Sequence, residues 1–259
     1  MKRYAIYNIK GGVGKTATAT NLCYLSAKEG RKTLIWDLDP QGAATFYFNT
    51  KPKVKGGSKS VIKAKELEEL IKATDFDNLD ILPADFSYRN LDLSLSEAKK
   101  SKKRIAMLLD ELNEEYDTIF LDAPPNISLV SENIFYAVDY LIVPVIPTVL
   151  SIRTLAQIEE YIEKNSIKNI TLLPFFSMVD RRKNLHKNTI IENKNRMLSH
   201  LIPYSSAIEH MGVFQKPVGE FAANSIASRA YVELWDEIKE RSNKEHNDIL
   251  AKIFGGSAK

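Results

Sequence analysis

The chain has little cysteine, few histidines and no long apolar run. Its 259 residues include a single cysteine, Cys23, so an intrachain disulfide is excluded and a reducing compartment is favoured. The four histidines are scattered and show none of the spacings typical of a metal site. No apolar run approaches the roughly 20 residues that a membrane-spanning helix requires. These absences favour a cytoplasmic globular protein, with Cys23 as a buried, inert thiol on one side of a helix.

Neither sign of charge dominates the composition. The sequence has 36 basic and 33 acidic residues and a net charge of +3, with 44% apolar and 27% charged residues. This balance is that of an ordinary globular protein and does not by itself indicate a nucleic-acid partner. The basic residues are unevenly spread, however, and cluster at 51–65, 99–104, 181–187 and 194–196. Taken alone, each cluster is typical of a solvated surface.

Apolar runs alternate with helical patterns along the whole chain, and no internal repeat divides it. The alternation predicts an α/β protein with a single doubly wound, mostly parallel sheet and helices on both faces. We expect strands near 4–8, 33–37, 79–83, 117–122, 140–145, 169–178 and 201–204, and helices near 15–28, 65–73, 96–115, 128–137, 151–164, 184–200 and 225–241. No linker is evident. We therefore expect one domain over 1–259, without an N-terminal extension and with a flexible tail over 242–259.

A glycine-rich loop separates the first expected strand from the first expected helix. It consists of Lys10, Gly11, Gly12, Val13, Gly14, Lys15, Thr16 and Ala17. Glycines let the backbone turn tightly and approach phosphate oxygens, and the N–H groups of the loop and of the helix start attract negative charge. In this pattern Lys15 reaches the β- and γ-phosphates, and the Thr16 hydroxyl binds Mg²⁺. The loop therefore predicts a nucleotide site.

Three carboxylates follow two other expected strands. Asp37 and Asp39 lie two residues apart, which places both on one side of an extended chain. Asp122 ends a run of four apolar residues. Because ligands of such sheets bind beyond the carboxyl ends of the strands, we expect these side chains beside the loop. One carboxylate of the first pair would orient the attacking water, the other would support Mg²⁺, and Asp122 would hold Mg²⁺.

The loop departs from the usual phosphate-binding pattern in a specific way. Ile9 stands where that pattern has its first glycine, and an additional lysine, Lys10, opens the loop. The loop thereby resembles the deviant Walker A motif of the ParA/MinD family of P-loop ATPases. The chain also resembles ParA-type members of this family at 37–42 (Walker A′), 122–125 (Walker B), 177–181 (beside the adenine pocket), 217–221 and 230–237.

This resemblance implies a P-loop ATPase that uses ATP and Mg²⁺. It implies catalytic roles for Lys10, Lys15 and Asp39, metal binding by Thr16, Asp37 and Asp122, nucleotide binding by residues 10–17, and an adenine pocket near Met178 and Asp180. In the family the additional lysine, here Lys10, crosses a dimer interface to the partner's nucleotide. The family usually has a second threonine where this chain has Ala17. Backbone N–H groups can still hold the α-phosphate, so we expect binding to survive this change.

The resemblance also implies partners. An ATP-bound homodimer would bind double-stranded DNA without sequence preference, and a ParB-like or other activating protein would stimulate a weak intrinsic ATPase activity. The cycle would position or segregate a cargo, such as a plasmid, a chromosome or a protein assembly, on the nucleoid. The segment 221–228 has no basic residue. The candidate DNA contacts are therefore Arg181, Arg182, Lys183, Lys187, Lys194, Arg196 and Arg229.

Two other functions are alternatives to this hypothesis. A MinD-like membrane ATPase would use the apolar residues of 249–256 as a short amphipathic tail. Against it, Glu245 and Asp248 lie beside that tail, where a membrane helix favours a richly basic polar face. A metabolic P-loop enzyme is the other alternative. A relative that binds an iron–sulfur cluster needs two cysteines per subunit, and no motif indicates the substrate pocket of an amide-forming synthetase.

Overall fold

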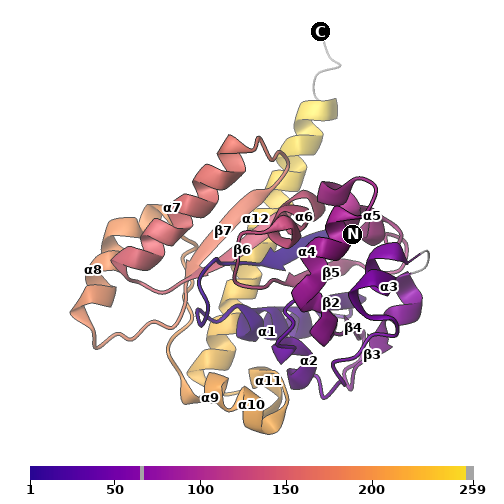
Figure 1. The fold of residues 1–259 in the computed structure, drawn as a ribbon. Helices are drawn as coiled ribbons and strands as arrows, with labels where there is room; N and C mark the ends of the chain where they lie inside the picture. Colours follow the sequence, from indigo (N-terminus) through magenta and orange to yellow (C-terminus); the bar gives the residue numbers. More distant parts are fainter. Residues whose placement is uncertain (65–66, 255–259) are drawn as a thin grey trace.

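The computed structural model describes residues 1–64 and 67–254, and the side chains of the last helix as far as residue 244. Seven strands form one sheet in the order β3-β4-β2-β5-β1-β6-β7 (Figure 1). The strands are β1 (Lys2–Ile6), β2 (Thr33–Asp37), β3 (Lys72–Ala73), β4 (Leu79–Leu82), β5 (Thr118–Asp122), β6 (Tyr140–Val145) and β7 (Thr171–Phe176). Every pair is parallel except β3 with β4. The expected fold class is confirmed.

Two layers of helices cover the sheet because its central strands are apolar on both sides. On one face, Tyr4, Ile35 and Phe120 pack against α1 (Lys15–Lys28) and α12 (Ile226–Phe254). On the other face, their strand neighbours pack against α4 (Leu91–Ser96), α5 (Arg104–Asp110), α6 (Leu129–Ala137) and α7 (Val149–Lys164). Continuous apolar strands are typical of a parallel sheet buried on both faces. Cys23 is fully buried in the α1 layer, as expected.

Shorter elements connect these layers and carry much of the polar surface. They are α2 (Ala43–Tyr47), α3 (Gly57–Lys63), α8 (Asn184–Asn193), α9 (Ser206–Glu209), α10 (Met211–Phe214) and α11 (Val218–Phe221), with the 3₁₀ turns η1 (Leu67–Leu70), η2 (Phe86–Asn90), η3 (Ser101–Lys103) and η4 (Lys194–Arg196). In Figure 1, α3 and α5 lie at the right side of the molecule and α8 lies at the left side.

Several expected elements differ from the observed ones. Of the helix expected at 65–73, the described part forms only the 3₁₀ turn η1 at Leu67–Leu70, because Lys72 and Ala73 pair with β4 at the edge of the sheet. The helix expected at 96–115 is broken where Lys100 takes a left-handed conformation with φ of 56°. The strand expected at 201–204 is reduced to one bridge between Val179 and Pro203, since proline has no N–H to extend a ladder.

The last helix is longer than the sequence pattern predicts. The backbone of α12 continues beyond residue 241 to Phe254. The expected flexible tail at 242–259 thus begins within this helix, and its part at 255–259 lies outside the described residues. The side chains of the amphipathic segment 249–254 are likewise outside what is described. Over the described chain, no helix combines the length and apolar character needed to cross a membrane.

Candidate nucleotide site

Three central strands end at the same level of the sheet. In the register of β5, Asp122 is the partner of Ile6 on β1 and of Asp37 on β2. The chain beyond each strand is tied to its neighbour, because Leu38 N–H donates to the Asp122 carbonyl (3.0 Å) and Ala123 N–H to the Ile6 carbonyl (3.2 Å). The fold therefore places the glycine-rich loop and both strand-end carboxylates at one edge, as the sequence predicts.

The loop has the backbone conformation that its glycines permit. Gly12 and Gly14 have φ of 70° and 90°, a left-handed region that disfavours other residues. A Cβ on Gly14 would lie 3.0 Å from Ser177 Oγ, so the segment after β7 also restricts this position. Gly14 caps α1 without any side-chain hydrogen bond. The N–H groups at the start of α1 therefore face a position where an anion would bind favourably.

Asn8 anchors this loop, a role that the sequence pattern does not reveal. The side chain is fully buried. Its Nδ2 donates to the Pro144 carbonyl on β6 (2.8 Å), and its Oδ1 accepts from Lys10 N–H (2.9 Å). The start of the loop is thus fixed to the neighbouring strand before any ligand binds.

The two lysines of the loop differ sharply in environment. Lys15 is 7% exposed, and its Nζ donates to the Lys10 carbonyl (3.2 Å). Burial lowers the pKa of Lys15, while the nearby Asp122 and Asp39 carboxylates oppose this shift. The Lys10 side chain is exposed and makes no ion pair or hydrogen bond with the residues that the structure describes. The Lys15 ammonium is therefore held within the loop of its own chain, whereas the Lys10 side chain lies on the surface.

Asp122 is a buried carboxylate without a hydrogen-bond donor. Its two oxygens lack a partner among the described residues. Burial, and then the charge of Asp37, raise the pKa of Asp122 well above its ordinary value. The Thr16 hydroxyl faces it without meeting hydrogen-bond geometry and, together with Lys15, counteracts the rise. Such a group requires a proton or a cation.

Asp37 is buried too, but its oxygens are occupied. Its Oδ2 accepts hydrogen bonds from the Thr45 N–H (2.8 Å) and hydroxyl (2.7 Å), and its Oδ1 accepts from Asp39 N–H (3.2 Å). Burial raises the pKa of Asp37 to about 6, although the Thr45 donors lower it. Asp37 thus fixes the start of α2 and adds negative charge beside Asp122. The contribution of Thr45 has no signal in the linear motif.

These residues fit a hydrated Mg²⁺. Hard oxygen donors are what this ion prefers, and it usually takes one or two protein ligands beside phosphate oxygens and waters. The unpartnered oxygens of Asp122 and the Thr16 hydroxyl supply such donors. In the described chain no group of three or more acidic, cysteine or histidine side chains forms a closed metal cage. A metal here would therefore be held together with a nucleotide.

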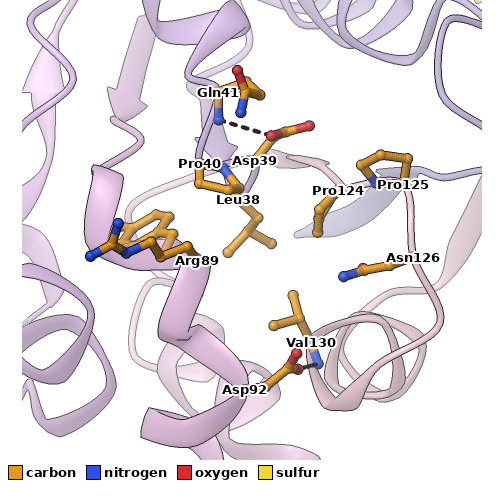
Figure 2. A pocket seen from close by; sticks show the side chains of 11 residues that line it. Leu38, Asp39, Pro40, Gln41, Arg89, Asp92, Pro124, Pro125, Asn126 and Val130 are labelled. Atoms are coloured by element: carbon orange, nitrogen blue, oxygen red, sulfur yellow. Dashed lines mark hydrogen bonds between the residues drawn. The ribbon is translucent and has the colours of Figure 1, made fainter.

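Asp39 borders a cavity of about 270 Å³ whose lining includes the segments that follow β2 and β5. Its Oδ1 accepts from Gln41 N–H (2.9 Å), which fixes the carboxylate without burying it. Figure 2 shows Asp39 between Gln41 and the turn formed by Pro124, Pro125 and Asn126, with Arg89 on the other wall. The cavity leaves room for water beside the Asp39 carboxylate. Only Oδ1 of that carboxylate contacts Gln41 N–H.

The segment expected beside adenine is held in a strained form. Met178 has φ of 55°, which is uncommon for a residue other than glycine and is typical of functional segments. Val179 exchanges backbone hydrogen bonds of 3.0 Å with Ile202 and Tyr204. Asp180 N–H donates to Nδ1 of His186, which is 5% exposed and lies on α8 (3.1 Å). The sequence singles out Met178 and Asp180 but misses His186.

The expected DNA contacts are not equally available. Arg182 binds the Asp180 carboxylate through Nε and Nη2, both at 2.9 Å, and holds the pKa of Asp180 far below its ordinary value. Arg196 Nη2 contacts Glu159 at 2.6 Å. Arg181 and Arg229 line one cavity of about 410 Å³. The remaining candidates are exposed and, within the described structure, form no ion pair: Lys183, Lys187 and Lys194.

A parallel sheet with a glycine-rich loop, a buried lysine and strand-end carboxylates at one edge defines a P-loop nucleotide-binding protein. The comparisons with known proteins extend this. A family model described as an AAA domain matches residues 1–173. The chain belongs to this family and, within it, to the ParA-type P-loop ATPases of the ParA/MinD group.

Similar proteins cover almost the whole chain. MJECL24 of Methanocaldococcus jannaschii, described as uncharacterized, is 31% identical, with coverage of 89% of this chain and 95% of its own. The chromosome partitioning protein ParA of Myxococcus xanthus is 27% identical, over 91% of this chain and 87% of its own. A crystal structure of a plasmid partition protein from Borrelia burgdorferi has a TM-score of 0.74 at 22% identity, covering 93% and 98% of the two chains. The last match supports the fold alone.

Proposed function

We propose that this protein is a ParA-type ATP hydrolase that works as a dimer switch on DNA. It binds ATP with Mg²⁺, dimerises in that state, and then binds double-stranded DNA without sequence preference. A partner protein, ParB-like or another activator, stimulates a weak intrinsic hydrolysis. The cycle positions or segregates a cargo on the cytoplasmic nucleoid. The name of one relative, the chromosome partitioning protein ParA of Myxococcus xanthus, supports this role.

The observation that carries the proposal is the difference in exposure between the two lysines of the loop, Lys15 and Lys10. Lys15 is buried against the loop, where it supplies charge to the phosphates of its own nucleotide. Lys10 starts the same loop but is exposed, so its ammonium can reach a nucleotide bound by a second copy. A cation supplied across an interface stabilises the charge that develops during phosphoryl transfer, as an arginine finger does.

The remaining residues have roles that follow from their environments. Asp39 lies beside a water-accessible cavity and would orient the attacking water. The loop N–H groups and Lys15 would hold the β- and γ-phosphates. Thr16 and Asp122 would hold Mg²⁺, which neutralises charge on the phosphates when bound. Asp37 would act through its charge and by holding Asp39 N–H in place.

The test compares two lysine variants of the same loop. Lys15→Ala removes the charge on the phosphates and should abolish ATP binding. Lys10→Ala should bind ATP as a monomer but fail to dimerise and lose stimulated turnover, by up to the roughly 10³–10⁵-fold typical of an arginine finger where chemistry limits the rate. Lys164→Ala, on the exposed end of α7, is the matched control. Calorimetry measures nucleotide binding, and light scattering after size exclusion with ATP measures the dimer.

A Lys10→Ala protein that dimerises and hydrolyses ATP like the wild type, with DNA and the partner present, would contradict the dimer switch. An ATP-bound wild type that stays monomeric at all concentrations would contradict it as well.

A further inference from the structure

Two basic segments that are distant in the sequence meet on one side of the molecule. The first includes α3 and the second η3, and Arg104 joins them. Its Nε donates to the Ile62 carbonyl (2.7 Å) and its Nη2 to the Ala64 carbonyl (3.0 Å). Figure 1 shows α3 beside α5, which follows η3 directly. The basic clusters at 51–65 and 99–104 are therefore neighbours in the folded chain.

The lysines of this region are exposed and uncompensated. We call them the α3–η3 surface: Lys55, Lys59, Lys63, Lys99, Lys100 and Lys103. Over the part of the chain that the structure describes, none of the six forms an ion pair. Lys102 is excluded from the set because Glu132 binds it at 2.8 Å. The sequence has no acidic residue at 51–64 or at 98–109.

Three carboxylates border this region, and none of them forms an ion pair with its six lysines in the described structure. The two oxygens of Asp85 accept hydrogen bonds from the N–H groups of Val54 and Ser87, both at 2.9 Å. Asp92 accepts a hydrogen bond from Val130 N–H (2.8 Å) on α6. Glu97, which begins the turn before η3, is exposed and makes no ion pair in the described structure. Six lysines beside these three carboxylates leave the surface with a net positive charge.

More of the charge is paired in the cluster at 181–196, where two of the six basic residues bind carboxylates, than beside the α3–η3 surface, where Lys102 does so. The carboxylates of Asp180 and Glu159 already bind Arg182 and Arg196. A cation that is held by a carboxylate releases fewer counterions from a polyanion, because it must first give up its own partner. In the described structure, the largest group of unpaired basic residues therefore lies on the side of α3 and not on the side of α8.

We propose that the α3–η3 surface is a second surface by which this protein contacts the phosphates of double-stranded DNA. This inference rests on the proposed function, in which the ATP-bound protein binds DNA. Lysine is a point charge on a flexible stem, so it suits contacts that follow the backbone without reading bases. A membrane is a poorer fit. The apolar side chains of α3, Val61 and Ile62, are buried in the core and cannot insert into lipid.

The test is the salt dependence of DNA binding in matched variants. The first variant is Lys59→Gln/Lys63→Gln/Lys100→Gln. The comparison variant is Lys183→Gln/Lys187→Gln/Lys194→Gln on the other side, and the control is Lys164→Gln/Lys168→Gln at the end of α7. Affinity for a duplex of random sequence is measured with ATP and Mg²⁺ over a range of salt. Unstimulated ATP hydrolysis and the ATP-dependent dimer serve as checks of the fold.

We expect the first variant to flatten the slope of log K against log salt by about 0.9 for each phosphate that is no longer neutralised, or about 2.7 for three phosphates. Its ATP hydrolysis and dimer should match the wild type, and the α7 control should leave the slope unchanged. An unchanged slope in the first variant, with the wild type and its dimer binding DNA normally, would overturn this surface but leave the proposed function intact.

Absence of ATP-dependent DNA binding in the wild type at any salt would overturn the proposed function and this surface together. Vesicles of anionic phospholipid provide the remaining arm. If the wild type sediments with vesicles and the first variant does not, while DNA binding of the variant persists, the surface belongs to membranes and the DNA contact is overturned.

Discussion

A buried carboxylate with no hydrogen-bond donor is costly to a fold, and Asp122 is such a residue. The protein tolerates it beside a second buried carboxylate, Asp37, and a buried lysine, Lys15. Protonation relieves the repulsion between the two carboxylates at low pH, and a cation relieves it at neutral pH. The buried charges therefore lower the stability of the ligand-free protein, and binding of the ion and the nucleotide restores it.

The sign of the pH dependence follows from the raised pKa values. Asp37 titrates near 4 when unfolded and at about 6 in the fold, so the folded state holds its proton longer. The stability from this group is fully present below about 4 and is lost as the pH rises through about 6. The pKa of Asp122 is raised further, which extends the loss to higher pH.

We therefore predict that Asp122→Asn makes the ligand-free protein more stable at pH 7.5. The variant keeps the shape of the side chain but removes an uncompensated buried charge. The expected rise in Tm is on the order of 5–10 °C, and it should shrink at pH 5, because the raised pKa of Asp122 favours the protonated carboxyl as the pH falls. Thermal melts at both pH values, with and without MgATP, measure this. MgATP should raise the Tm of the wild type much more than that of the variant. A destabilised variant at pH 7.5 would show that the Asp122 charge does not weaken the fold.

Asp39 should behave differently, because under the proposed function it acts on water and not on the nucleotide. We predict that Asp39→Ala binds ATP with near-normal affinity and forms a persistent dimer, while phosphate release falls to background. Size exclusion with ATP and a phosphate-release assay measure the two properties. A monomeric, nucleotide-free Asp39→Ala protein would instead assign the residue to folding or to Mg²⁺ binding.

At the scale of elements, the glycine-rich loop contains its own matched pair. A Cβ added at Gly11 would meet nothing within 4 Å. At Gly14 the backbone has φ of 90°, which disfavours other residues, and an added Cβ would lie 3.0 Å from Ser177 Oγ. We predict that Gly11→Ala leaves the Tm nearly unchanged, whereas Gly14→Ala destabilises the fold by about 1–2 kcal/mol or more. Chemical denaturation measures both. Equal stability of the two variants would show that the loop adapts around residue 14.

The segment after β7 depends on α8 through one hydrogen bond. Asp180 N–H donates to His186 Nδ1, and an asparagine Oδ1 can accept at a similar place. We predict that His186→Leu weakens ATP binding about 5- to 30-fold, because the partly buried N–H of Asp180 loses its acceptor. His186→Asn should keep most of the affinity.

Inorganic triphosphate, which lacks the base, separates the possible causes. Its affinity should be the same in both His186 variants if the residue positions only the adenine segment. An equal loss for ATP and triphosphate in His186→Leu would indicate a general effect on the fold.

At the scale of the whole molecule, the DNA surface should depend on the nucleotide state. Under the proposed function, each protomer would bring lysines that bind DNA weakly alone, and dimerisation would join two copies on one body. We predict that affinity for random duplex DNA is higher with ATP than with ADP by about 10²-fold or more, and that it falls steeply with salt. Fluorescence anisotropy with a labelled duplex measures it. Equal affinity in both nucleotide states would separate DNA binding from the ATP switch.

The class of fold and the chemistry of the nucleotide site follow from the order of the amino acids alone. The alternation of apolar runs with helical patterns is local, so it indicates the parallel sheet before any contact is known. The glycines of the loop and the aspartates at the ends of β2 and β5 can also be found, because each lies at a fixed distance from its own strand.

The folded chain establishes which side chains are supported and which charges are free. Asn8 on Pro144, Thr45 on Asp37 and His186 on Asp180 join residues whose contacts no linear motif records. The edge strand β3 forms only because β4 lies beside it. The basic clusters look alike in the sequence, yet one is partly neutralised by Asp180 and Glu159, while the α3–η3 surface is not. Charge compensation depends on contacts between distant segments, and those contacts exist only once the chain has folded.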